Sequence, residues 1–190
     1  MNKDNSGLDV KSFNIKNLIF CALFTGLTCV FARFTVPIGV VPITLANLVI
    51  YFAGAMLGPL YGALSQVLYL ILVFVGFGFT ARLQAGPAYL VGPTAGYMYG
   101  YILMAFFVGL IYKRFGKNSE KYIVKVAWLI IGCVVGTASC YFLGTVWLMF
   151  QQKISVEQAL LSGVYPFLLV DSIKILIASL VFPRFEKIIK

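Results

Sequence analysis

The chain has 190 residues, of which 61% are hydrophobic, 16% aromatic and only 11% charged. Soluble domains are about 45–50% apolar and about 25% charged, so this composition excludes an ordinary water-soluble globule and also a disordered chain. A mean hydropathy of +0.96 indicates an integral membrane protein instead, in which the net charge of +9 records topology rather than a nucleic-acid partner.

Apolar runs long enough to cross about 30 Å of hydrocarbon predict an all-α fold with six transmembrane helices. They lie at residues 17–32, 41–57, 60–77, 93–112, 123–150 and 159–182. The second is short and interrupted at Gly54, and the fifth is long enough to tilt. Pro166 either kinks the sixth or marks its true start. The first run lacks the A-x-A cleavage site of a signal peptide, so it is predicted to remain as a span.

The distribution of positive charge predicts that both termini lie in the cytoplasm. Eleven lysines and arginines fall in residues 1–16, in the loop around residues 113–125 and in residues 183–190, whereas three fall on the other side. Such an excess is typical of cytoplasmic loops. The chain is therefore divided into a cytoplasmic N-terminal segment (1–16), a membrane domain (17–182) and a cytoplasmic tail (183–190).

Several chemistries are excluded by missing residue types. There is no histidine and no GxxxxGK[ST] phosphate-binding loop, which argues against histidine-dependent catalysis and against ATP hydrolysis by this chain. We expect no metal site and no cofactor. The cysteines lie in apolar runs and are expected to be small packing residues: Cys21, Cys29, Cys133 and Cys140.

Asp171 and Lys174 are the strongest candidates for a functional site. They are three residues apart in the last span, so both project from one face of a helix. A charge in the bilayer centre costs about 3 kcal/mol or more, and intramembrane ionisable residues usually serve function. The alternative is a structural ion pair that binds nothing.

Weaker candidates lie nearer the outside. Thr44 and Asn47 are three residues apart and are predicted to share a helical face, where they bind either a ligand or a neighbouring helix. The glycine-rich segment 76–92 is either a surface loop or a lid over an outward pocket. Arg82 in it either pairs with a carboxylate or lies at the lipid headgroups. Tyr97 either lines a pocket or belongs to the interfacial aromatic belt.

Four motifs, taken together and in this order, resemble the BioY family of biotin-specific S-components of energy-coupling-factor (ECF) transporters. They are Val41-Pro42-Ile43-Thr44-Leu45, the segment from Ala53-Gly54 through Gly58-Pro59 to Ser65, Gly92-Pro93-Thr94-Ala95-Gly96-Tyr97, and Asp171-x-x-Lys174. The resemblance runs over nearly the whole chain.

This resemblance implies the six-helix ECF S-component fold and capture of biotin from outside the bacterial plasma membrane. It also implies two partners besides the lipid bilayer, a transmembrane coupling protein and a pair of ABC-type ATPases, and no nucleic acid. Asp171 and Lys174 would hold the ureido ring of biotin. The small-residue pair Ala22 and Gly26 is similar to the motif with which S-components meet their coupling protein.

The outer loop departs from the family pattern. Where the family commonly has a Gly-Gly-x-Gly-Gly run, this chain has the stretch from Arg82 to Gly86. Gln84 lies where the resemblance implies a polar contact to the ligand, and Gly86 completes the candidate binding residues.

Three alternatives remain at this stage. Instead of a biotin S-component, the chain could be an S-component for another vitamin, such as thiamine or riboflavin, a stand-alone secondary carrier, or an intramembrane enzyme. The carrier is disfavoured by the absence of a visible internal repeat. The enzyme is disfavoured because a lone acid beside a lysine lacks the acid–base groups that hydrolysis usually needs.

Overall fold

The computed structural model describes residues 15–36, 40–77, 80 and 85–189, which are almost entirely helical. In chain order its elements are α1 (Ile15–Ala32), β1 (Thr35–Val36), β2 (Ile43–Thr44), α2 (Ala46–Val75), α3 (Pro87–Leu90), α4 (Ala95–Ile111), the π-helix η1 (Tyr112–Gly116), α5 (Tyr122–Gln152), α6 (Val156–Gly163) and α7 (Tyr165–Ile189). The strands β1 and β2 pair antiparallel, with Thr35 opposite Thr44.

Five of these helices are long and apolar enough to cross a membrane: α1, α2, α4 with η1, α5 and α7. Large apolar side chains are exposed along them, among them Phe142 (70% exposed), Leu169 (71%) and Ile123 (78%). Such surfaces are matched to acyl chains rather than to water. The predicted class, an all-α membrane protein, agrees with this architecture.

Helix α2 joins the second and third predicted segments across a kink. Gly58 has φ 78° and ψ −176°, a conformation that glycine adopts readily, and Pro59 cannot donate to the preceding turn. A Cβ on Gly62 would lie 3.0 Å from Cα of Gly54, although eight residues of straight helix span about 12 Å. The two arms of α2, residues 46–57 and 59–75, therefore fold toward each other.

The predicted interruption at Gly54 is wrong, because Gly54 is helical and the break lies at Gly58. Gly54 serves packing instead. A Cβ there would lie 2.6 Å from the carbonyl oxygen of Ala105, so the missing side chain lets α2 and α4 approach closely.

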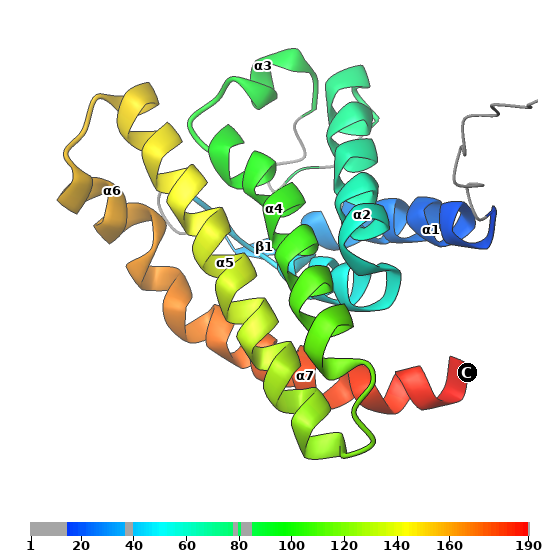
Figure 1. Cartoon of the computed structure of the whole chain (residues 1–190). Helices are drawn as coiled ribbons and strands as arrows, with labels where there is room; N and C mark the ends of the chain where they lie inside the picture. The colour runs from blue at the N-terminus through cyan, green and yellow to red at the C-terminus, as the bar shows by residue number, and fades with distance from the viewer. Residues whose placement is uncertain (1–14, 37–39, 78–79, 81–84, 190) are drawn as a thin grey trace, which may run out of the picture.

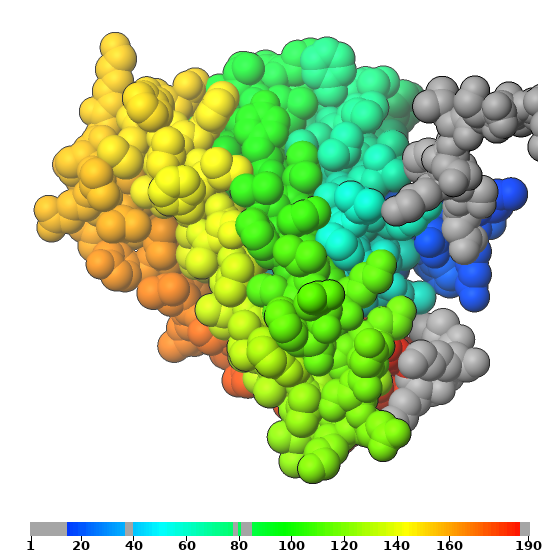
Figure 2. Space-filling model, in the orientation of Figure 1, coloured from blue at the N-terminus to red at the C-terminus, as the bar shows by residue number. Residues whose placement is uncertain are grey.

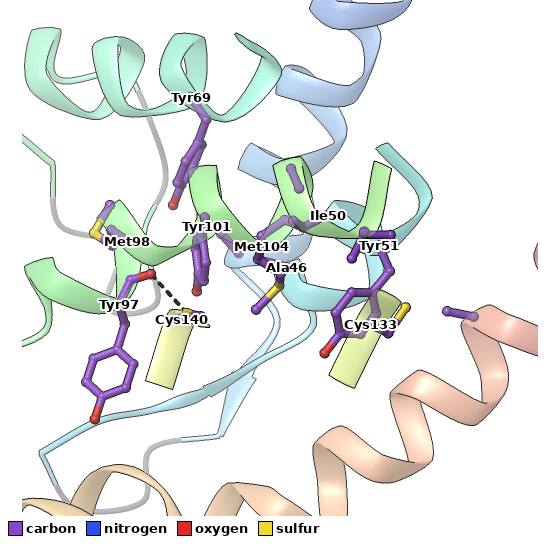
Figure 3. Packing of buried hydrophobic residues seen from close by; sticks show 14 of the residues in the cluster. Ala46, Ile50, Tyr51, Tyr69, Tyr97, Met98, Tyr101, Met104, Cys133 and Cys140 are labelled. Atoms are coloured by element: carbon purple, nitrogen blue, oxygen red, sulfur yellow. Dashed lines mark hydrogen bonds between the residues drawn. The ribbon is translucent and has the colours of Figure 1, made fainter. Parts of the chain in front are cut away.

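Helix α4 lies between α2 and α5 at the centre of the molecule (Figure 1). Buried side chains from all three helices meet there, as Figure 3 shows for Tyr51, Tyr69, Tyr101, Met104 and Cys133. The rings of Tyr69 and Tyr101 are 6.4 Å apart. All four cysteines are buried with free thiols, which confirms their predicted packing role.

The sixth predicted span consists of two helices. Ser155 and Gln158 form a capping box at the start of α6, which ends at Gly163. Pro166 lies in the first turn of α7, where a missing N–H interrupts no helical hydrogen bond. Pro166 thus marks the true start of the last long helix, which continues beyond residue 182 to Ile189.

In the space-filling view, α4 and α5 form much of the front face and α1 projects at one side (Figure 2). Helix α1 contacts chiefly α2. Thr25 Oγ1 donates to the carbonyl oxygen of Ser65 at 2.9 Å, and Cys21 Sγ donates to that of Tyr61 at 3.0 Å. Buried hydrogen bonds therefore help to hold α1 against the second arm of α2.

Candidate functional site

The Asp171–Lys174 pair lies on one face of α7, as predicted. Lys174 Nζ is 2.8 Å from Asp171 Oδ1, and the two residues are only 5% and 3% exposed. Two opposite charges in contact form a locally neutral unit, which lowers the cost of placing either one in an apolar interior. The pair is thus the polar centre of a buried cluster.

Residues from three other elements complete this cluster. Tyr141 of α5 donates its hydroxyl to Asp171 Oδ2 at 2.6 Å, and Lys174 Nζ also donates to the carbonyl oxygen of Thr44 in β2 at 2.7 Å. Asn47 Nδ2, in the first turn of α2, lies 3.3 and 3.4 Å from the two carboxylate oxygens of Asp171. We call Thr44, Asn47, Tyr141, Asp171 and Lys174 the polar cluster.

One acceptor in the polar cluster has no donor. Asn47 Oδ1 is buried without a hydrogen-bond partner among the described residues. A buried polar atom without a partner is rare in folded proteins, because it has lost its hydrogen bonds to water and has formed no others. An N–H group from a bound molecule would satisfy this oxygen.

Thr44 and Asn47 do not share a helical face, so that prediction is wrong. Pro42 favours extended backbone around it, and Ile43–Thr44 forms strand β2 before α2 begins at Ala46. Thr44 Oγ1 accepts from the backbone N–H of Ala46 at 3.1 Å. The two residues still meet in the polar cluster, Thr44 through its backbone and Asn47 through its side chain.

A small cavity of about 40 Å³ adjoins the polar cluster at Thr44. Its walls come from α1, β2, α2, α3 and α4 and from the segments beside them, and they include four tyrosines, Tyr69, Tyr89, Tyr97 and Tyr101. Ligand pockets usually measure about 300–1,000 Å³. A vitamin-sized molecule would therefore have to displace some of these side chains.

Tyr97 lines this cavity and is buried at 7% exposure, which places it in a pocket wall rather than on the molecular surface. Its hydroxyl donates to the carbonyl oxygen of Gly163 at 3.1 Å, and its ring is shown in Figure 3.

Gly86 has φ 106°, and its N–H donates to the carbonyl oxygen of Val73 at 2.7 Å. Gly86 therefore shapes the loop after α2. Arg82 and Gln84 lie outside the described residues.

The sequence did not point to Tyr141. A tyrosine in a long apolar helix resembles an ordinary packing residue. One signal was available in the sequence. Thr137 lies one helical turn before Tyr141, so the two polar side chains share one face of α5. The hydroxyls of Thr137 and Tyr51 are 2.7 Å apart, so this face of α5 is polar over more than one turn.

The predicted partner residues Ala22 and Gly26 lie on an exposed face of α1. A Cβ on Gly26 would have no atom within 4 Å. Within the described part of the chain, no group of three or more His, Cys, Asp or Glu side chains is placed to hold a metal ion.

The chain is similar in sequence to proteins of one family. A sequence model of the BioY family matches residues 3–190. The biotin transporter BioY of Thermotoga maritima is 33% identical over 92% of this chain and 98% of that protein. The probable biotin transporter BioY of Pyrococcus horikoshii is 32% identical over 90% of this chain and 96% of that protein.

Solved structures agree with these relatives. The crystal structure of the S-component for biotin from an ECF-type ABC transporter matches with a TM-score of 0.79 and 27% identity, over 96% of this chain and 95% of that one. The S component of a bacterial ECF transporter matches with a TM-score of 0.61 over 92% of this chain and 95% of that one. Its identity of 18% makes it a likeness of fold alone.

Proposed function

The chain belongs to the BioY family, and from this premise we propose that it is the biotin-binding S-component of an ECF importer in the bacterial cell membrane. The family consists of transporters rather than enzymes. The observation that carries the proposal is a buried polar cluster beside an aromatic cavity, within an otherwise apolar helical protein.

The chemistry of the polar cluster complements the ureido ring of biotin. That ring offers two N–H donors and one carbonyl acceptor. Asp171 and the unpartnered Asn47 Oδ1 would accept the N–H groups, while Lys174 would donate to the carbonyl. Tyr141 would hold the carboxylate of Asp171 in position.

The rest of biotin is apolar up to its carboxylate and suits the aromatic cavity. Tyr97 and the neighbouring tyrosines would enclose the thiophane ring and valeryl chain after moving to enlarge the cavity. We assign the carboxylate end to the outer loop, with Arg82 and Gln84 as its polar partners and Gly86 shaping that loop. Thr44 connects cavity and cluster because it belongs to both.

The proposed topology has six crossings, with the two arms of α2 counted separately and both termini in the cytoplasm. Lys16 at the start of α1, Lys117 after η1 and Glu186 near the end of α7 line one common groove. One described residue from each of the three basic segments therefore lies beside the same groove, which supports placing the segments on a single side of the membrane.

Transport would need a coupling protein and a pair of ATPases outside this chain. The exposed face of α1 around Ala22 and Gly26 supports this division, because small residues let another helix approach closely. We assign the coupling protein to that face.

Ligand binding to the purified protein tests the substrate. Isothermal titration should show tight binding of biotin, and neither thiamine nor riboflavin in large excess should compete. Displacement of biotin by either vitamin would refute the substrate assignment. Uptake of biotin into vesicles that contain this chain alone would refute the assignment as an S-component in favour of a self-sufficient carrier.

A further inference from the structure

Lys174 has two acceptors in the polar cluster, and one of them is a backbone carbonyl. Its Nζ donates to Asp171 Oδ1 at 2.8 Å and to the carbonyl oxygen of Thr44 at 2.7 Å. A lysine ammonium carries three N–H donors in a tetrahedral arrangement, so two directed bonds also fix the direction of the third. Among the described residues no further acceptor contacts this nitrogen, which leaves one N–H for a ligand.

The carbonyl of Thr44 is available to Lys174 because α2 does not begin one turn earlier. In a continuous helix this oxygen would accept from the N–H of Leu48, four residues further along the chain. That N–H donates instead to the carbonyl oxygen of Leu45 at 3.1 Å. The N–H of Leu45 donates in turn to the carbonyl oxygen of Phe34, next to strand β1, at 3.2 Å. The carbonyl of Thr44 therefore lies outside the helical hydrogen-bond pattern and reaches α7.

The side chain of Thr44 holds this turn in place. Its Oγ1 accepts from the backbone N–H of Ala46 at 3.1 Å, and both residues are buried. A threonine hydroxyl that bonds a backbone group nearby in the sequence competes with helix formation and stabilises a turn instead. The N–H of Ala46 belongs to the first turn of α2, where a helix has no acceptor of its own to offer. Loss of the hydroxyl would leave this N–H buried without a partner, which favours a rearranged turn.

We propose that Thr44 is a positioning residue for Lys174. Its side chain fixes the turn before α2, and the turn directs the Thr44 carbonyl at the ammonium. That carbonyl and Asp171 together aim the third N–H of Lys174 at the carbonyl of the ligand. The inference rests on the proposed function, because the ligand carbonyl is that of the ureido ring. It differs from a direct contact between Thr44 and biotin, since the effect passes through the backbone and through Lys174.

Two substitutions separate the hydroxyl of Thr44 from the volume of its side chain. Thr44→Val keeps the shape of threonine and removes Oγ1. The affinity for biotin should fall about fivefold, which corresponds to the net contribution of one typical hydrogen bond. Thr44→Ser keeps the hydroxyl and should bind biotin like the wild type. Equilibrium binding of radiolabelled biotin to the purified proteins measures both.

Thr28→Val is the matched control for the loss of a buried hydroxyl. Thr28 is buried in α1, and its hydroxyl donates to the carbonyl oxygen of Phe24 at 2.8 Å, outside the polar cluster. This variant removes the same chemical group and should bind biotin like the wild type. An equal loss of affinity in Thr28→Val and Thr44→Val would point to a general packing effect and would overturn the proposal.

A double-mutant cycle shows whether Thr44 acts through Lys174. In Lys174→Met protein the Thr44 carbonyl has no ammonium to orient, so adding Thr44→Val should leave the remaining biotin affinity unchanged. The same cycle can be measured without a ligand, by denaturation in detergent. Thr44→Val should lower the unfolding midpoint of the wild type by more than that of Lys174→Met protein, because only the wild type has the contact to lose.

The proposal is overturned if Thr44→Val binds biotin as tightly as the wild type, or if Thr44→Ser binds as weakly as Thr44→Val. It is also overturned if Thr44→Val weakens binding equally with and without Lys174, which would indicate a direct contact between the hydroxyl and the ligand. Failure of the proposed function gives a different result, in which the wild type itself binds no biotin. The denaturation cycle then still decides the positioning role, and equal shifts in both backgrounds would refute it.

Discussion

At the scale of single residues, the buried Asp171–Lys174 ion pair has a structural role, and we propose a functional role for it as well. Each charge is tolerable in the interior because the other lies 2.8 Å away and because Tyr141 and the carbonyl of Thr44 share the hydrogen bonding. A buried ion pair costs little folding free energy while both charges are present. Removing one charge leaves the other uncompensated and costs much more. Its two roles can therefore be separated by removing one partner or both.

Loss of one partner should destabilise the protein more than loss of both. Lys174→Met leaves the carboxylate of Asp171 buried without a cation and should cost about 3–5 kcal/mol of unfolding free energy. The Asp171→Asn, Lys174→Met double variant should recover most of that loss. Denaturation in detergent micelles measures both. Equal stability of the single variant and the wild type would mean that the pair is hydrated rather than buried.

Tyr141 should act as a positioning residue for Asp171. Tyr141→Phe removes one hydrogen bond to a charged carboxylate, worth about 1.5–3 kcal/mol, and should weaken biotin binding roughly tenfold or more. Tyr99→Phe is the matched control, because its hydroxyl donates to the carbonyl oxygen of Leu90 outside the cluster. Calorimetric titration compares the two. If both variants bound biotin equally well, Tyr141 would have no part in the site.

At the scale of elements, α2 and α4 approach each other closely at their glycines. A Cβ on Gly109 would lie 2.5 Å from the carbonyl carbon of Gly58, so no side chain fits there without backbone movement. Gly109→Ala should therefore lower stability by about 1–3 kcal/mol. Gly26→Ala, with open space around it, should raise stability by about 0.5–1 kcal/mol through helix propensity. Thermal unfolding in detergent compares the two variants. Equal changes in stability for Gly109→Ala and Gly26→Ala would contradict the packing argument.

Helix α1 should couple the protein to its energising module through its small residues. Gly26→Leu adds a bulky side chain on the exposed face of α1 and should reduce biotin uptake by cells that also contain the coupling protein and ATPases. Biotin binding by the purified variant should be unchanged, because Gly26 contacts no part of the polar cluster. Undiminished uptake would exclude this face as the contact.

The long helices were predictable from the sequence because each contains a long apolar run with few charged residues. Their irregular ends were not. Thr44 lies in a strand because Pro42 stops the helix from starting earlier, and the apolar run alone does not show this. The break at Gly58 was predictable, because Gly58-Pro59 separates the second and third predicted spans. Gly54 was not distinguishable in the sequence from a helix interruption, and only the packing of α4 against it shows its role.

The candidate site was predictable only in part, for a related reason. Asp171 and Lys174 stand out because charges are rare in spans. Tyr141 joins them from α5, thirty residues before Asp171, and such a contact depends on how α5 and α7 pack.

At the scale of the whole molecule, the proposed orientation places both termini in the cytoplasm. All four native cysteines are buried, so introduced cysteines provide clean reporters. Asn118→Cys should react with a membrane-impermeant maleimide only after cells are opened, whereas Gln152→Cys should react in intact cells. The reverse pattern would invert the topology and place the aromatic cavity on the cytoplasmic side.

The central claim is that the polar cluster binds biotin, and equilibrium biotin binding by paired variants tests it most directly. The Asp171→Asn, Lys174→Met protein should lose at least about hundredfold in affinity, since hydrogen bonds to two charged groups disappear. The Lys125→Met, Glu186→Gln protein loses another ion pair of the same 2.8 Å length and should bind biotin like the wild type. Normal binding by the first variant, or an equal loss in both, would contradict the account.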